Sequence, residues 1–210
     1  MQLQASEQHS LQVLDSQTRA LVRLSAIVAS GSEGEIRDAM SGIASEVPPE
    51  WVEELLLQTH LFAGFPRALN AMREWRRVQP EPLTDHESVD LERRRADGIA
   101  TCSAVYGTMY DRLRENIRAL HPLLDDWMIT EGYGKALSRP GLDLPRRELC
   151  IVAACAAQNQ DRQLHSHLRG ALNVGVAPLV ITDTIDVIAD LLGAARAQSV
   201  RLLWARVRGK

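Results

Sequence analysis

Apolar residues recur every three or four positions through most of this chain, a spacing that gathers them on one face of a helix. Runs of β-branched residues are short, and aromatic residues make up only 4% of the sequence. The pattern therefore predicts an all-α fold. Helices are expected over residues 10–30, 33–45, 49–78, 84–120, 143–158, 161–174 and 177–207. Breaks are expected at short segments rich in Gly, Pro and Ser, namely SGSEG, SEVPPE, QPEPLTD, SRPGLD and NVGVAP.

Two long segments match each other when the sequence is shifted by 128 or 129 positions. The matched pairs are Arg19 with Arg147, Gly42 with Gly170, Gly64 with Gly193, Trp75 with Trp204, and Arg77 with Arg206. We therefore predict a tandem duplication, with a first helical copy in residues 1–80, a connecting helical region in 81–142 and a second copy in 143–210. Gly64 and Gly193 fall inside predicted helices, where glycine is unfavourable, so we expect each to permit close contact between helices.

The overall charge and the length of the apolar runs argue against two classes of partner. The formal net charge is −3 and the pI is about 6.1, which provides no long-range attraction to nucleic acid. The longest uncharged apolar run, LCIVAACAA, is much shorter than the roughly 20 residues of a membrane span. The polar start MQLQASEQHS lacks the apolar core of a secretory signal. We expect a soluble, cytoplasmic protein that binds neither nucleic acid nor a membrane.

The three cysteines, Cys102, Cys150 and Cys155, form no Cys-x-x-Cys pair and are odd in number. This spacing favours neither a disulfide framework nor a zinc site. We expect each to be a small buried residue in a reducing compartment.

One stretch of the second copy brings a carboxylate and an imidazole within reach of each other. If residues 151–158 and 163–174 form an antiparallel hairpin that turns near Asn159 and Gln160, the side chains of Glu148 and His167 can face one shared pocket. His167 falls on or beside the apolar stripe of the second helix.

His167 is either a core histidine satisfied by hydrogen bonds or an acid–base group whose tautomer Glu148 fixes. The first copy has alanine at both matched positions, Ala20 and Ala39, although the surrounding packing residues persist. A pair needed only for folding should have survived in both copies, which favours the acid–base interpretation. His165 lies two positions away on the same helix and points elsewhere, so His165 and His167 cannot share a metal ion.

The segment EGYGKALSRPGLDLPRRELCIVAACAAQNQDRQLHSHLRGALNVGV resembles the carboxymuconolactone decarboxylase family, within the alkylhydroperoxidase D-like fold. It is similar to the family in an aromatic-Gly segment, an Arg-Pro-Gly-Leu turn, an Arg-Glu-Leu helix start and a His-x-Arg-x-Ala-Leu-Asn-x-Gly helix end. The first copy adds LLLQTHLFAGFPRALNAMREWRR, which resembles the family's C-terminal helix with its Ala-Gly-Phe-Pro signature.

The resemblance implies roles for Glu148 and His167, which match the Glu and His of the family's proton relay. In the peroxidase branch, two cysteines complete that relay, but their positions hold Gln160 and Gln163 here. A thiolate is the nucleophile of that chemistry, so we expect no thiol peroxidase activity.

The decarboxylase branch implies a cofactor-independent lyase that acts on a small carboxylated lactone or a related acid, typically in aromatic catabolism. His167 would deliver one proton, with Glu148 as its partner. Three arginines, Arg139, Arg147 and Arg169, are candidates for binding a dianionic substrate, because a guanidinium binds a carboxylate in a fork. The remaining candidates for substrate contact are Tyr133, His60 and Phe65, with Phe62 beside them. His60 and the two phenylalanines come from the first copy, which would complement the second around a single site.

The resemblance also implies a homo-oligomer, a trimer or a hexamer, and the apolar stripe of residues 55–65 agrees with burial between subunits. A second class of function stays open. The chain could be a non-catalytic member of the fold that binds a small molecule or serves as an assembly subunit.

Overall fold

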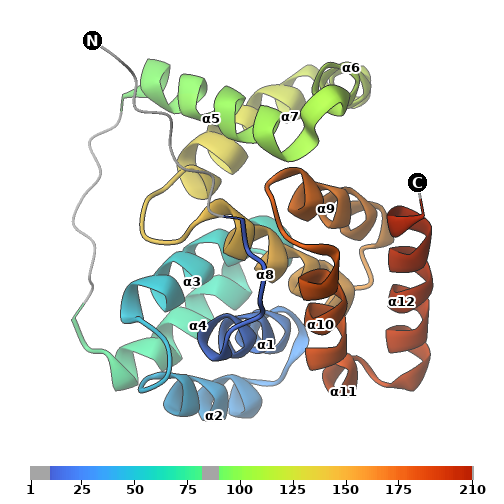
Figure 1. The fold of residues 1–210 in the computed structure, drawn as a ribbon. Coiled ribbons are helices and arrows are strands. Elements are labelled where there is room, and N and C mark those ends of the chain that lie inside the picture. Colours follow the sequence, from blue (N-terminus) through green and yellow to red (C-terminus); the bar gives the residue numbers. More distant parts are fainter. Residues whose placement is uncertain (1–9, 82–89, 210) are drawn as a thin grey trace.

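The computed structural model describes residues 10–81 and 90–209, and every regular element in these ranges is a helix. The all-α fold class is therefore confirmed. Four helices come first: α1 (Ser16–Ser30), α2 (Glu33–Ile43), α3 (Pro49–Ala63) and α4 (Phe65–Val78), as Figure 1 shows. Within the described ranges, no helix is both long and apolar enough to cross a membrane.

The middle of the chain contains more helix than the sequence predicts. It forms α5 (Leu91–Tyr106), the short 3-10 helix η1 (Gly107–Met109), α6 (Tyr110–Leu120), α7 (Pro122–Trp127) and the π-helix η2 (Met128–Leu137). Gly107, with φ 52°, interrupts the helix predicted over 84–120, whose first residues lie outside the described ranges. The last two helices were missed. In η2 the amide of Ser138 donates to the carbonyl of Tyr133, five residues earlier, a period that three- and four-residue spacings do not detect.

The last part of the chain forms α8 (Leu144–Ala157), α9 (Asp161–Asn173), α10 (Pro178–Val187), α11 (Ala189–Leu192) and α12 (Ala194–Arg208). A shift of 128 or 129 positions brings α1, α2 and α4 onto α8, α9 and α12, with bounds that agree within about two residues. Helix α3 falls in the same way on α10 and α11 together. The matched tryptophans, Trp75 in α4 and Trp204 in α12, are both buried, with 1% and 4% of their surface exposed.

The expectation that Gly64 and Gly193 permit close contact between helices is wrong. Each ends one helix and precedes the next, with φ values of 84° and 76°, in the region that favours glycine. A Cβ at Gly193 would meet no atom within 4 Å, and one at Gly64 would meet only Pro66 Cδ at 3.7 Å. These glycines are needed for the direction of the backbone, and each divides a predicted long helix into two.

Helix α8 lies at the centre of the molecule, and all of its residues from 147 to 156 are buried. Helix α1 packs against it (Figure 1), and the hydroxyl of Ser25 donates to the carbonyl of Cys150 at 2.7 Å. Apolar residues of both sets of helices form one continuous core. Leu55 and Leu56 belong to this core, so much of the apolar stripe at 55–65 is buried within the chain rather than left for another subunit.

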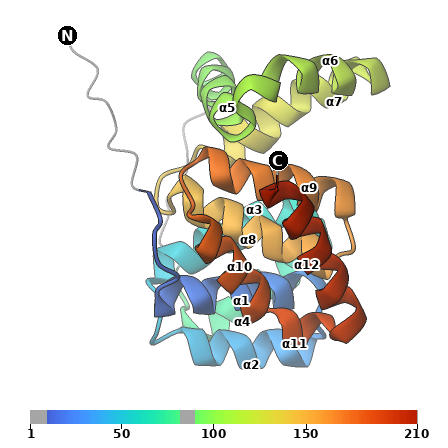
Figure 2. The same ribbon diagram turned by 45° about the vertical axis from the view of Figure 1, so that its right-hand side comes forward.

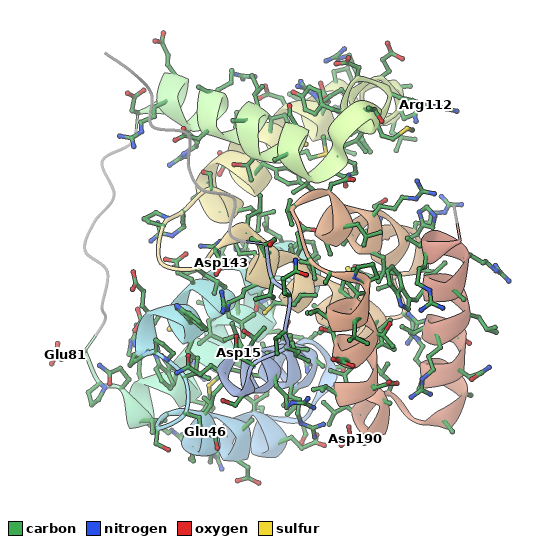
Figure 3. The ribbon with its side chains drawn as sticks, in the orientation of Figure 1. Asp15, Glu46, Glu81, Arg112, Asp143 and Asp190 are labelled. Atoms are coloured by element: carbon green, nitrogen blue, oxygen red, sulfur yellow. The ribbon has the colours of Figure 1, made fainter. Side chains whose placement is uncertain are left out.

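The N-termini of α1 and α8 are capped by aspartates at matched positions, Asp15 and Asp143, which Figure 3 places close together. Each carboxylate accepts a hydrogen bond from a backbone amide in the first turn of its helix. Arg146 bridges the two caps, since it binds Asp15 at 3.0 Å and also contacts Asp143. Its guanidinium stacks on the ring of Trp51, 4.4 Å from the centroid.

Helices α5, α6 and α7 form a layer over one end of the other helices, as Figure 2 shows. Helix α5 crosses η2 with backbone against backbone at Gly98 and Gly134. A Cβ at Gly98 would lie 2.2 Å from the carbonyl oxygen of Ile129, and one at Gly134 would lie 2.1 Å from that of Arg94. Glycine at both positions therefore allows the approach that joins the upper layer to the core.

Candidate active site

Glu148 and His167 meet inside the hairpin of α8 and α9. Helix α8 ends at Ala157 and α9 begins at Asp161, and the turn between them contains Asn159 with φ 57°, a left-handed conformation that asparagine tolerates. The turn lies where the sequence predicts it. Nδ1 of His167 is 2.9 Å from Oε2 of Glu148, so the structure brings the two predicted residues together in a direct hydrogen bond.

The pair is almost completely removed from solvent, since Glu148 is 0% and His167 is 5% exposed. The direction of the hydrogen bond depends on the tautomer of His167: when the group of Glu148 is a carboxylate, it accepts from Nδ1 and leaves Nε2 available for proton exchange. Nε2 makes no hydrogen bond with a residue of 10–81 or 90–209. Oε1 of Glu148 is also buried without a partner in this part of the chain. A buried oxygen of this kind is energetically costly and marks a position for a polar ligand or a proton.

Gly170 provides the space that the carboxylate of Glu148 occupies. A Cβ at Gly170 would lie 2.5 Å from Oε2 of Glu148 and 2.7 Å from Cγ1 of Val105. At Gly42, the matched position of the first half, a Cβ would meet no atom within 4 Å. Glycine at 170 is therefore required by the site, whereas the same residue at 42 is not required by packing.

The first half of the chain contributes Phe62 to the surroundings of His167. The two rings are perpendicular, with centroids 5.5 Å apart. The side-chain amide of Gln160, in the hairpin turn, donates to the carbonyl of Phe62 at 3.1 Å and links this segment to the site. His60 and Phe65 lie next to each other, with ring centroids 4.8 Å apart, but no ring contact joins either to His167. Phe65 is 63% exposed.

Two tyrosines lie near Glu148. Tyr106 ends α5, Tyr133 lies in η2, and their rings are perpendicular with centroids 6.2 Å apart. Burial raises the pKa of Tyr106 to about 12, and the charge of Glu148 acts in the same direction. The pKa of Tyr133 is raised well above its ordinary value, first by burial and then by Tyr106 and Glu148. Both phenols are therefore neutral hydrogen-bond donors at physiological pH. The prediction includes Tyr133 and misses Tyr106, which has no counterpart in the quoted motifs.

Arg147 cannot bind a substrate, which corrects one of the sequence predictions. Its side chain is 0% exposed, and its guanidinium donates to Glu54 at 2.8 Å, to Gln58 at 3.1 Å and to the carbonyl of Leu142 at 3.0 Å. Burial lowers its pKa, while the hydrogen bond to Glu54 raises it. Arg139 also binds Glu54, through two hydrogen bonds of 3.1 Å. Both arginines hold the core together across the two halves of the chain.

Arg139 also lines a cavity of about 340 Å³, whereas Arg169 lines a larger one. The larger cavity has a volume of about 730 Å³ and lies between α5, η1 and α6 on one side and α9 and the end of α12 on the other. The Nε of Arg169 is buried and has no partner among the described residues. His165 lines the same cavity, so the two histidines of HSH lie on different faces of α9, as predicted. Val105 lines the cavity and also lies against Gly170, and Tyr106 lines the cavity as well, so the cavity adjoins the surroundings of Glu148.

The cysteines are buried, as predicted, and all three thiols are free. Burial raises the pKa of Cys102 and of Cys155 to about 12, and it raises that of Cys150 still further. All three are therefore protonated at neutral pH, and a thiolate nucleophile is not formed. In the ranges 10–81 and 90–209, no group of three His, Cys, Asp or Glu side chains is arranged to hold a metal ion.

Part of the chain matches a known family. Residues 123–206 match the carboxymuconolactone decarboxylase family, and this segment includes η2, the α8–α9 hairpin and most of α12. The match covers less than half of the chain and lies in its second part.

Two curated proteins, both named Peroxisomal protein 2, are similar over a longer part of the chain. The one from Schizosaccharomyces pombe is 29% identical over 149 residues, which cover 68% of this chain and 68% of the relative. The one from Saccharomyces cerevisiae is 25% identical over 151 residues, which cover 58% of this chain and 53% of the relative. The match thus spans about half of the length of the second relative.

Proposed function

We propose that this chain, which matches the carboxymuconolactone decarboxylase family over residues 123–206, is a cofactor-independent carboxy-lyase that uses Glu148 and His167 as an acid–base pair. The observation that carries the proposal is the buried hydrogen bond of 2.9 Å between His167 Nδ1 and Glu148 Oε2. The proposed substrate is a small carboxylated lactone or a related acid. The pair has no counterpart at the matched positions of the first half, Ala20 and Ala39, so it is not needed to build this hairpin.

The proposed chemistry requires one proton from the protein. When the carbon–carbon bond to the substrate carboxylate breaks, carbon dioxide leaves and the electron pair is delocalised onto the lactone carbonyl as a dienolate. A protonated His167 then delivers the Nε2 proton to carbon, while Nδ1 stays bound to Glu148, and solvent restores the proton. Glu148 holds the ring in this orientation and stabilises its positive charge, as a carboxylate partner does for a catalytic imidazole.

The surroundings of the pair support this chemistry. Phe62 shields the imidazole from solvent, and a low-polarity environment strengthens the interaction of the pair with a charged intermediate. The neutral phenols of Tyr106 and Tyr133 are candidate donors for a developing enolate oxygen. A thiol peroxidase is not supported, because Gln160 and Gln163 occupy the cysteine positions and the three thiols remain protonated.

The test is a decarboxylation assay with γ-carboxymuconolactone, in which released carbon dioxide is measured for the wild-type protein, His167→Asn and Glu148→Gln. Glu148→Gln keeps the size of the side chain, and His167→Asn replaces the imidazole by a smaller neutral polar group. Loss of the acid–base pair should lower kcat by about 10²- to 10⁴-fold. Arg162→Gln is the matched control, because Arg162 is exposed on the same hairpin. Equal rates in all four proteins would remove the proposed role of the pair.

A non-catalytic role in small-molecule binding is the second candidate function. It is favoured by the cavity of about 730 Å³, which has an apolar lining and two arginines. Absence of turnover with a panel of carboxylated lactones and related acids, together with saturable binding of a ligand, would support this candidate over the lyase.

We also propose that the chain arose by tandem duplication, with the copies in residues 1–80 and 143–210 joined by 81–142. The support is the common order of helices, the matched caps Asp15 and Asp143, and the matched positive-φ glycines Gly64 and Gly193. Phe62 from the first half lies against His167 from the second, so the two halves would share one site.

Self-association as a trimer or a hexamer is proposed through the α6–α7 layer. Helix α6 buries none of its residues, and four apolar side chains there are exposed, namely Leu120, Leu123, Leu124 and Trp127. Light scattering measures the mass of the particle, and Leu123→Glu should lower it.

The location of the protein in the cell has two candidates. The sequence predicts the cytoplasm, whereas the names of the two relatives support the peroxisome. Fluorescence microscopy of the tagged chain beside a peroxisomal marker distinguishes them.

A further inference from the structure

The cavity on the outer face of α9 combines apolar walls with two arginines. Its apolar lining includes Leu113, Leu172 and Val207, which come from three different helices. Its volume of about 730 Å³ lies within the range of pockets that enclose a drug-sized molecule. A molecule with an apolar body of that size is a suitable occupant.

With His165 neutral, every charged side chain that lines the cavity is an arginine. Arg112 on α6 and Arg169 on α9 line the cavity from opposite sides, and no Asp or Glu is part of its lining. Figure 3 shows Arg112 at the edge of the upper layer. Neither arginine forms an ion pair with a carboxylate of residues 10–81 or 90–209, whereas arginines elsewhere, such as Arg114 and Arg147, are bound to acidic side chains.

Arg169 provides the main evidence that the cavity binds a ligand. Its Nε is buried without a hydrogen-bond partner among the described residues, which is unfavourable for a cationic donor. A carboxylate, sulfonate or phosphate would satisfy that donor, because these groups match the fork of a guanidinium. An apolar or cationic occupant would leave the Nε of Arg169 unsatisfied.

We propose that this cavity binds a small organic anion with an apolar body. The anionic group lies between Arg112 and Arg169, and the apolar body packs against Leu113 and Leu172. Arg112 is a residue that the sequence does not single out, because it comes from the connecting region rather than from the matched segments. The proposal does not rest on the acid–base chemistry, because it concerns binding and is tested by binding alone.

The test compares two fluorescent probes of nearly the same shape. The probe 8-anilinonaphthalene-1-sulfonate carries an anionic group on an apolar body, and N-phenyl-1-naphthylamine is its neutral counterpart. Fluorescence titrations measure the Kd of each probe for the full chain, for Arg169→Gln and for Arg112→Gln. Arg162→Gln is the matched control, because Arg162 lies on the same helix, is exposed and does not line the cavity.

We expect the sulfonate to bind saturably, with a Kd that rises about tenfold or more in Arg169→Gln and in Arg112→Gln, the loss expected for one charge-assisted hydrogen bond. The neutral probe should bind these variants as it binds the wild-type protein, and Arg162→Gln should change neither Kd by more than about twofold. A bulky residue in the cavity, Ala104→Phe, should weaken both probes. Thermal unfolding by circular dichroism checks that each variant is folded.

Two results would overturn the proposal. One is no saturable binding of the sulfonate to the wild-type chain. The other is a Kd for the sulfonate that is the same in the wild type, Arg169→Gln and Arg112→Gln, because binding would then take place elsewhere.

Discussion

Replacing Gly170 by alanine tests whether the carboxylate of Glu148 is held against the backbone of α9. The new Cβ would lie 2.5 Å from Oε2 of Glu148 and 2.7 Å from Cγ1 of Val105, and real Cβ atoms do not approach other atoms so closely. Since Glu148 is buried and bound to His167 at 2.9 Å, it can move only by breaking that hydrogen bond.

Two opposing effects set the size of the change in stability. Alanine gains about 0.5 to 1 kcal/mol over glycine inside a helix, whereas overpacking of a buried site costs about 1 to 3 kcal/mol. Gly170→Ala should therefore destabilise the protein by about 1 kcal/mol, which for a chain of this size lowers Tm by roughly 2 to 4 °C. Gly42→Ala is the control, because a Cβ there meets no atom within 4 Å, and this variant should be as stable as the wild type or slightly more stable.

Denaturation followed by far-ultraviolet circular dichroism measures both variants, and a double-mutant cycle with Glu148→Ala separates the cause. If the clash is with the carboxylate, the cost of Gly170→Ala should fall when Glu148 is absent, by about 0.5 kcal/mol or more. The decarboxylation rate of Gly170→Ala should fall as well. Equal stability and activity in Gly170→Ala, Gly42→Ala and the wild type would refute the idea that Gly170 positions Glu148.

Three further predictions concern stability and reactivity. Glu54→Gln should cost about 3 kcal/mol in urea denaturation, because it leaves Arg139 and the fully buried Arg147 without their shared carboxylate; a cost below about 1 kcal/mol would contradict this. The hydrogen bond from Arg114 holds the pKa of Asp125 below its ordinary value of 3.8. The stabilisation is therefore complete at neutral pH and is lost as the pH falls below about 3.8. The protection factors of the amides in α6 and α7, which correct hydrogen exchange for its intrinsic rate, should therefore be lower at pH 3 than at pH 7. They should fall less in Asp125→Asn, where they are already lower at pH 7. The three buried thiols should react with Ellman's reagent at pH 8 only after denaturant is added, and rapid reaction of the native protein would contradict their burial.

Several features of the site follow from local sequence patterns. The spacing of apolar residues predicts α8 and α9 to within about two residues, and the turn near Asn159 follows from the break between them. Once the hairpin is expected, the positions of Glu148 and His167 on its facing sides follow from helical geometry. The burial of Cys150 and Cys155 also follows, because both lie in the apolar run LCIVAACAA.

The tertiary structure decided the role of each arginine and the extent of the site. From the sequence alone, Arg147 and Arg169 are equally plausible ligands of an anion. In the folded chain, Arg147 donates to Glu54, 93 residues away, and is buried in the core. Packing between helices that are distant in the sequence also brings Phe62 against His167 and Arg112 into the lining of the cavity. The sequence also does not reveal the helix breaks at Gly64 and Gly193, because the spacing of apolar residues continues nearly unchanged across each positive-φ glycine. Periodicity is a local property that reports which face of a helix is buried, whereas the partner of a charged side chain depends on which helices pack together, and only the folded chain determines that.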